Sequence, residues 1–175
     1  MDAVAWLLSW PVFGVACFVV AAALALGAWR WRATLALALG TGAADLVGDR
    51  VLRPWFGRMR PCYALPAELV HRVGEGADLG SIPSLHAANF FAMAFVVTAS
   101  RPRLGPIAYA LATAVAWSRI QVGVHWPTDV LAGALWGTLC GAIAWRALAP
   151  RQRPPARGAA APDERSGGVG ERSDA

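Results

Sequence analysis

The sequence lacks lysine: all sixteen of its basic residues are arginine. These arginines stand at the ends of apolar runs and form no basic helix with interleaved aromatics, which argues against nucleic acid as a partner. Only three cysteines are present, and two of them, Cys17 and Cys140, lie inside apolar runs, so no disulfide framework is predicted. Carboxylates are few and no paired His/Cys motif occurs, so we predict no metal and no other cofactor.

Apolar residues are abundant instead. They make up 57% of the 175 residues and include nine tryptophans, and the mean hydropathy is +0.44. This composition is typical of a membrane protein rather than a soluble domain. No basic residue precedes the first apolar run, so we expect that run to be a retained helix and not a cleaved signal peptide.

Five apolar runs approach the roughly 20 residues that a helix needs to cross the hydrocarbon core. They cover residues 6–28, 33–52, 85–100, 104–121 and 128–148. The sequence therefore predicts an all-α, polytopic membrane helix bundle with about five transmembrane helices in one domain, residues 1–149. Residues 150–175 are rich in Pro, Gly, Ala and charge, which is typical of a disordered tail.

The distribution of arginine predicts the orientation of this bundle. With five crossings, the loops after the first and third runs share one side with the tail, and this side carries Arg30, Arg32, Arg101, Arg103, Arg146, Arg151, Arg153 and Arg157. The positive-inside rule makes this side cytoplasmic. We therefore expect a bacterial inner-membrane protein whose tail is cytoplasmic and whose other face meets the periplasm or exterior.

Three polar clusters fall on the predicted outer face. RPWFGRMRP (residues 53–61) follows the second run, PSLH (83–86) opens the third, and WSRIQVGVHWPTD (117–129) joins the fourth to the fifth. Two of the three histidines in the chain lie in these clusters. The parity of the crossings brings the clusters to one side, so they predict a single site at the outer face.

His125 is the residue that a helix boundary explains least well. Asp129 follows it by four residues and can orient its imidazole, and an oriented neutral imidazole is a nucleophile or a base. Ser84 fits either a simple helix N-cap or an anion site, because helix N-termini offer free N–H groups. His86 stands one turn inside that helix.

Arg53, Arg60 and Arg119 each fit a lipid-headgroup anchor when taken singly. Together they give three fixed positive charges near two imidazoles and a helix N-terminus, which is an arrangement suited to phosphate. Phosphoryl transfer requires charge neutralisation on the phosphoryl oxygens, a nucleophile in line and an acid for the leaving group. This set of residues supplies all three.

The spacing of the clusters resembles the three-part signature of the type 2 phosphatidic acid phosphatase superfamily. The matching elements are basic-x6-Arg-Pro at Arg53, Pro-Ser-x-His at Pro83, and Ser-Arg-x5-His-x3-Asp at Ser118. Within that superfamily the chain looks like the short bacterial undecaprenyl-diphosphate phosphatases associated with bacitracin resistance. Two positions depart from the signature, since Arg53 replaces a lysine and Leu85 replaces a glycine, and we interpret both as tuning rather than inactivation.

The resemblance implies a metal-independent reaction with assigned roles. His125 would attack phosphorus and form a phosphohistidine, Asp129 would hold its tautomer, and His86 would protonate the leaving oxygen. The phosphoryl oxygens would be held by Arg53, Arg60, Arg119, Ser84 and the backbone at Leu85. Both histidines have reference pKa values near 6.5, so the rate is expected to be bell-shaped in pH.

The first substrate candidate is undecaprenyl diphosphate, converted to undecaprenyl phosphate. The alternatives are phosphatidylglycerophosphate, phosphatidate or lipid A, and the motifs do not separate these because the chemistry touches only the phosphate. Vanadium haloperoxidases share the signature but are soluble and longer. A non-enzymatic alternative is a catalytically impaired membrane protein that only binds anionic lipid, and it predicts that His125→Ala leaves function intact.

Overall fold

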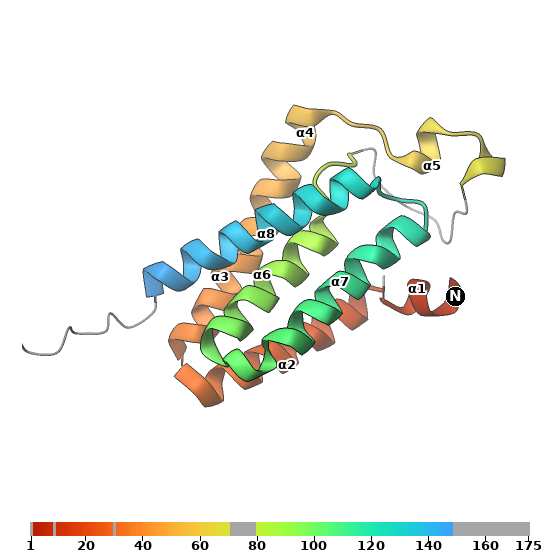
Figure 1. Cartoon of the computed structure of the whole chain (residues 1–175). Helices are drawn as coiled ribbons and strands as arrows, with labels where there is room; N and C mark the ends of the chain where they lie inside the picture. The colour runs from red at the N-terminus through yellow and green to blue at the C-terminus, as the bar shows by residue number, and fades with distance from the viewer. Residues whose placement is uncertain (1, 9, 30, 71–79, 149–175) are drawn as a thin grey trace, which may run out of the picture.

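The computed structural model describes residues 2–8, 10–29, 31–70 and 80–148. Over these ranges the fold is helical, and the only β feature is an isolated bridge between Met59 and Gly80. The long helices run side by side as a bundle, and the three polar clusters gather at one end of it (Figure 1). The all-α prediction is therefore confirmed, whereas residues 71–79 and the predicted tail, 150–175, lie outside the described residues.

The first apolar run forms two helices, α1 (Asp2–Leu8) and α2 (Pro11–Trp29), instead of the single helix expected over 6–28. Proline has no backbone N–H to continue a helix but fits the first turn of a new one. The first helix therefore ends at Leu8, and a new helix begins at Pro11. The hydropathy of the run gave no sign of this break.

The second run forms a longer helical rod than expected. α3 (Trp31–Val47) passes into a π-helical segment, η1 (Gly48–Leu52), and then into α4 (Arg53–Phe56). Val47 and Leu52 both have right-handed helical dihedral angles, so the rod is unbroken until Gly57, where φ is +54°. Arg53, which was expected just after the second helix, thus belongs to the continuation of that helix.

Two short helices, α5 (Pro61–Ala64) and η2 (Ala67–Leu69), follow the rod. The remaining helices lie within a residue of the predicted runs 85–100, 104–121 and 128–148. They are α6 (Leu85–Ser100), α7 (Gly105–Gln121) and α8 (Pro127–Leu148), with a 3-10 turn, η3 (Pro102–Leu104), between α6 and α7.

Glycines bring α8 into direct contact with the backbone of α6. Gly133, Gly137 and Gly141 recur every four residues on one face of α8, and a Cβ at any of them would collide with a carbonyl oxygen of Ser84, Ala88 or Ala92. Small residues at this spacing allow helices to approach closely, as is common within membranes. The start of α6 is therefore fixed against the first turns of α8.

Large apolar side chains lie on the outside of the bundle. Leu131, Leu135, Leu139 and Ile143 form a stripe on α8 that is between 50% and 66% exposed, while most buried core residues are alanines. Among the described helices, only α8 is both long enough and apolar enough to cross a membrane. The helical stretches Val12–Leu24 and Leu85–Ser100 are apolar but shorter. The prediction of five crossings is thus not established by helix length.

Candidate active site

The second and third polar clusters are joined through Asp129. The backbone N–H of Ser84 donates to the carbonyl oxygen of Asp129 at 3.0 Å, and the hydroxyl of Ser81 donates to its carboxylate. Asp129 is fully buried in the first turn of α8. The close approach of Gly133 to Ser84 thus holds the start of α6 against the backbone carbonyl of Asp129, while Ser81, just before α6, contacts the carboxylate.

His125 lies in the turn between α7 and α8 and is 2% exposed. Gly123, with φ of +71°, allows the chain to reverse, and the N–H of His125 donates to the carbonyl oxygen of Arg119 at 3.3 Å. Nη1 of Arg60 is 3.0 Å from Nε2 of His125. A guanidinium has only donors, so this contact requires a lone pair on Nε2 and places the imidazole proton on Nδ1.

The surroundings of His125 favour its neutral form. Burial, opposed by the Asp129 carboxylate and reinforced by the charges of Arg60 and Arg119, lowers the pKa of His125 to about 4. Nδ1 lies 3.7 Å from Oδ2 of Asp129, which is longer than a hydrogen bond. Asp129 therefore acts on the imidazole by its charge in this structure, and the contact expected to orient the ring is longer than a hydrogen bond.

Asp129 is instead held by partners that the sequence did not single out. Oδ2 accepts the backbone N–H of Trp126 at 2.8 Å and the Ser81 hydroxyl, and Oδ1 accepts Nη1 of Arg58 at 3.0 Å. Arg58 also donates to Thr128 at 2.6 Å and lies over the ring of Trp126. The sequence feature that could have pointed to them is their closeness to the predicted motifs. Ser81 is two residues before Pro83, and Arg58 is two residues before Arg60.

The three predicted arginines line one pocket. Arg53 projects from α4, and its Nη1 donates to Asp49 at 3.1 Å, an acidic partner that the sequence did not indicate. Arg60 is 4% exposed and also donates to the carbonyl oxygen of Val124 at 3.1 Å. Arg119 is in the last turn of α7, and its Nε is buried without a hydrogen-bond partner among the described residues.

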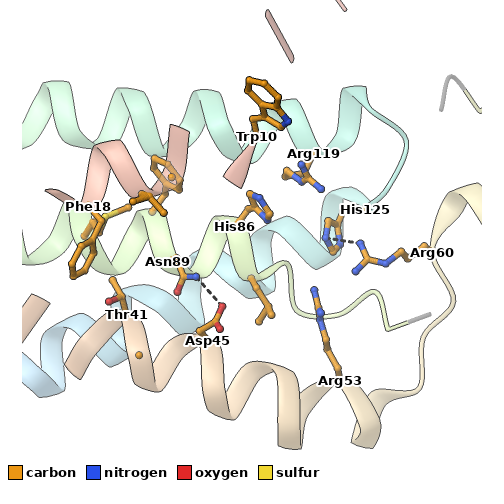
Figure 2. A pocket seen from close by; sticks show the side chains of 16 residues that line it. Trp10, Phe18, Thr41, Asp45, Arg53, Arg60, His86, Asn89, Arg119 and His125 are labelled. Carbon is orange, nitrogen blue, oxygen red and sulfur yellow. Dashed lines mark hydrogen bonds between the residues drawn. The ribbon is translucent and has the colours of Figure 1, made fainter. Parts of the chain in front are cut away.

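His86 and Leu85, in the first turn of α6, line the same pocket, whose volume is about 690 Å³. In Figure 2 His86, Arg119, His125 and Arg60 lie around one end of it, and Arg53 reaches toward them from the helical rod. The pocket then continues between α2, α3 and α6, past Asp45 and Asn89 toward Phe18. A cationic end with two imidazoles thus opens into a largely apolar groove.

Ser84 and Leu85 differ in part from their predicted positions. Ser84 is the N-cap residue of α6, but its hydroxyl makes no capping bond, is buried, and does not line the pocket. The side chain of Leu85 packs over Gly48 in the π-helical segment, where a Cβ would collide with it. The leucine that replaces the signature glycine is therefore accommodated at the pocket wall by a second glycine.

Other polar side chains lie near the site or in the segment before α6. His71, Glu75 and Asp78 lie outside the described residues. Asp45 of α3 makes an interhelical hydrogen bond, accepting from Nδ2 of Asn89 in α6 at 2.9 Å. Among the described residues no group of three or more His, Cys, Asp or Glu side chains is arranged to hold a metal ion.

Comparison with known proteins shows a match to the PAP2 superfamily over residues 31–153. The chain is 35% identical over 96 residues to the bacitracin transport permease protein BcrC of Bacillus licheniformis. The alignment covers 55% of this chain and 46% of that protein. It is 41% identical over 73 residues to the putative undecaprenyl-diphosphatase YbjG of Escherichia coli. The aligned residues make up 39% of this chain and 36% of that protein. The chain thus spans less than half the length of these two curated relatives.

A solved structure shares the fold. The crystal structure of a transmembrane PAP2 type phosphatidylglycerolphosphate phosphatase from Bacillus subtilis superposes with a TM-score of 0.63 at 26% identity. The alignment covers 86% of this chain and 77% of that one. The helical arrangement described above is therefore also that of a solved membrane protein.

Proposed function

Because the chain belongs to the PAP2 superfamily, we propose that it is a membrane lipid phosphatase that works through a phosphohistidine on His125. The observation that carries this proposal is the contact between Arg60 and Nε2 of His125. It gives a buried, neutral imidazole whose lone pair faces a cationic pocket. That is the arrangement a phosphate dianion needs in order to bind beside a nucleophile.

In the first step the phosphate oxygens take up the hydrogen bonds of Arg53, Arg60 and Arg119. Arg60 exchanges its contact with Nε2 for one with an oxygen, which exposes the lone pair to phosphorus. Nε2 then forms the N–P bond as the bond from phosphorus to the lipid oxygen breaks. Protonated His86 gives its proton to that leaving oxygen.

The charge that develops on the imidazole of His125 is balanced by Asp129, whose position Ser81 and Arg58 fix. In the second step neutral His86 takes a proton from water, the water oxygen attacks phosphorus, and the N–P bond breaks. Inorganic phosphate leaves and His125 is again neutral. No metal takes part in these steps, in keeping with the resemblance.

Undecaprenyl diphosphate is the first substrate to test. Support comes from the names of the two curated relatives, a bacitracin permease protein and a putative undecaprenyl-diphosphatase. A second candidate, a phosphomonoester with a hydroxyl near the phosphate, is favoured by the Asp45–Asn89 pair in the groove. Phosphatidylglycerophosphate, the lipid in the name of the Bacillus subtilis structure, is of that kind.

The site is proposed to face the periplasm or exterior, with five crossings in residues 1–149 and residues 150–175 as a cytoplasmic tail. The support is the arginine bias between the two faces. Labelling single introduced cysteines from outside intact cells tests this orientation. Labelling at position 69 in the outer loop but not at position 103 is the expected pattern, and the reverse would contradict it.

The test of the reaction is phosphate release by purified protein in detergent with EDTA. We expect release from the wild type, near-complete loss in His125→Ala, and no change in Thr138→Val, whose hydroxyl bonds only its own helix. Quenching in alkali, in which phosphohistidine survives, should reveal one added phosphoryl group by intact mass. Activity that persists in His125→Ala would rule out the proposed nucleophile.

A further inference from the structure

The groove behind the phosphate end is built from one face of each of three helices. His86, Asn89 and Met93 lie three and four residues apart on α6, which places them on one side of that helix. Gly14 of α2 and Gly42 of α3 leave the groove wide. A Cβ added at Gly42 would meet nothing within 4 Å, and one at Gly14 would meet only Phe90 at 3.9 Å.

Apart from Thr41, whose hydroxyl bonds its own helix, one polar pair interrupts the apolar wall. Asn89 donates its Nδ2 hydrogen to Oδ1 of Asp45 at 2.9 Å, across the space between α6 and α3 (Figure 2). Asp45 is exposed and makes no other hydrogen bond among the described residues. A carboxylate only accepts hydrogen bonds, and Oδ2 of Asp45 is not engaged by the described residues, so it can accept a hydrogen bond from a ligand in the groove.

The pair lies close to the phosphate end. Asn89 is three residues after His86 on the same helix, which corresponds to about 4.5 Å along the axis. A lipid whose phosphate sits between His86 and the arginines therefore places the first carbons of its alcohol beside Asp45. The acceptor meets the part of the substrate that distinguishes a prenyl chain from a glycerol or a sugar.

A plain hydrocarbon at this point would strip water from a carboxylate and give no donor in return, which is unfavourable. A second ionised phosphate would meet a like charge. A hydroxyl would fill the acceptor with a charge-assisted hydrogen bond. Of the groups that a lipid phosphate can carry here, a hydroxyl suits the site.

We propose that Asp45, positioned by Asn89, selects lipid phosphates whose alcohol carries a free hydroxyl on the carbon next to the phosphate-bearing one. The inference rests on the proposed phosphatase function and deepens it. Of the two substrate candidates named above, it favours the second, a phosphomonoester of a glycerol-like or sugar-like alcohol, over the first, a prenyl diphosphate. Asp45 binds the substrate, and Asn89 acts through Asp45.

The experiment compares two lipids that differ by one hydroxyl: 1-oleoyl lysophosphatidate and its 2-deoxy analogue. The readout is the ratio of their kcat/KM values for the whole protein in mixed micelles. We expect the wild type to prefer the hydroxyl-bearing lipid by about 10-fold or more, as for a hydrogen bond to a charged group. In Asp45→Ala the ratio should fall to about 1, and in Asn89→Ala it should fall partway.

Two further variants guard this comparison. Asp45→Asn removes the charge but keeps an acceptor and the size of the side chain, so it serves if the alanine variant does not fold. Thr41→Val alters the groove wall one turn away, where the hydroxyl bonds its own helix, and should leave the ratio unchanged. Hydrolysis of farnesyl diphosphate should rise in Asp45→Ala, because the opposing carboxylate is gone.

Failure of this inference is distinguishable from failure of the phosphatase proposal. If the wild type hydrolyses both lipids equally, or Asp45→Ala keeps the preference, hydroxyl selection is overturned while phosphatase activity stands. If no lipid is hydrolysed, affinities for the two corresponding phosphonates decide. A preference for the hydroxyl form that disappears in Asp45→Ala then supports the selection, and equal affinities reject it.

Discussion

The two walls of the phosphate end are held in place in different ways. On one side, α6 and α8 touch backbone to backbone through Gly133 and Gly137, and Asp129 is fixed at that contact. On the other side, the segment after Gly57 is tied by its backbone to the chain just before α6, through the hydrogen bond from Ser81 to the carbonyl oxygen of Arg58. It reaches the two catalytic candidates through long side chains, since Arg58 contacts Asp129 and Arg60 contacts His125.

This difference separates a rigid part of the site from an adjustable part. Helices in backbone contact cannot shift without breaking their packing, so Asp129 stays fixed whether or not substrate is bound. An arginine side chain can exchange one hydrogen-bond acceptor for another without a shift of the backbone, which lets Arg60 leave Nε2 when a phosphate oxygen takes its place. The site thus combines a carboxylate fixed by helix packing with cations placed by their side chains.

The largest effect is expected from breaking the rigid wall. In Gly137→Val the new side chain collides with the carbonyl of Ala88, so α6 and α8 must separate and the site should lose both stability and activity. Thermal unfolding in detergent and phosphate release measure this. Gly42→Ala is the matched control, because a Cβ at Gly42 meets nothing within 4 Å. Equal behaviour of the two variants would mean that the helix contact is not needed.

Breaking the adjustable wall should cost activity but not folding. Arg60→Lys keeps the charge but loses the planar fork that contacts both Val124 and His125. We expect kcat/KM to fall by about 10²–10³-fold, as when one transition-state donor is removed. The unfolding midpoint should stay near that of the wild type. An unchanged rate would show that charge alone suffices at this position.

Loosening Asp129 should have a smaller effect. Ser81→Ala removes one donor to its carboxylate and leaves those of Arg58 and Trp126. A loss of about 10-fold in kcat, with KM nearly constant, is expected because the carboxylate balances charge only in the transition state. Ser100→Ala, whose hydroxyl bonds its own helix, is the comparison variant. A change confined to KM would assign Ser81 to substrate binding instead.

The pH dependence sharpens the comparison without any change in sequence. Since the pKa of His125 is lowered to about 4, the nucleophile stays neutral down to that pH and the acid limb of kcat/KM should lie near it, not near 6.5. The alkaline limb should report loss of the proton on His86. An acid limb near pH 6.5 would contradict the lowered pKa of His125.

Stability should respond to the same group. Between pH 6.5 and 4 the unfolded chain binds a proton at His125 that the folded chain does not, so stability falls as pH drops through this window. The full effect is about 3 kcal/mol. Unfolding midpoints of wild type and His125→Gln measure it, and the variant should lose this part of the pH slope.

Most of the fold follows from the sequence, because hydropathy and helix-ending residues mark the same boundaries. The runs at 85–100, 104–121 and 128–148 coincide with α6, α7 and α8 to within a residue. The helix break before Pro11 and the continuation of the rod through Arg53 were not predicted. Pro11 begins a new helix, whereas Pro54 lies in a helical rod that continues through it. Packing against neighbouring helices selects between these two outcomes, and local sequence does not show it.

The site was predicted where the sequence carries fixed spacings. His86, His125 and the three arginines do line one pocket, and Asp129 lies behind it. Arg58 and Ser81 were missed because they contact Asp129 across 71 and 48 residues, and single-sequence spacing carries no information about such contacts. The loose His125–Asp129 separation was missed for the same reason, since the competing donors were unknown.

The packing of Leu85 over Gly48 has an evolutionary consequence. A glycine at position 85 would remove this contact and leave Pro83 and Trp136 as the neighbours of position 48, each at 3.8 Å, whereas with a leucine at position 85 any side chain at position 48 must displace the end of that leucine. The two positions should therefore change together among natural homologues. Sequences of this family that carry a bulky residue in place of the signature glycine should also carry a glycine in the second helix, at the position facing it.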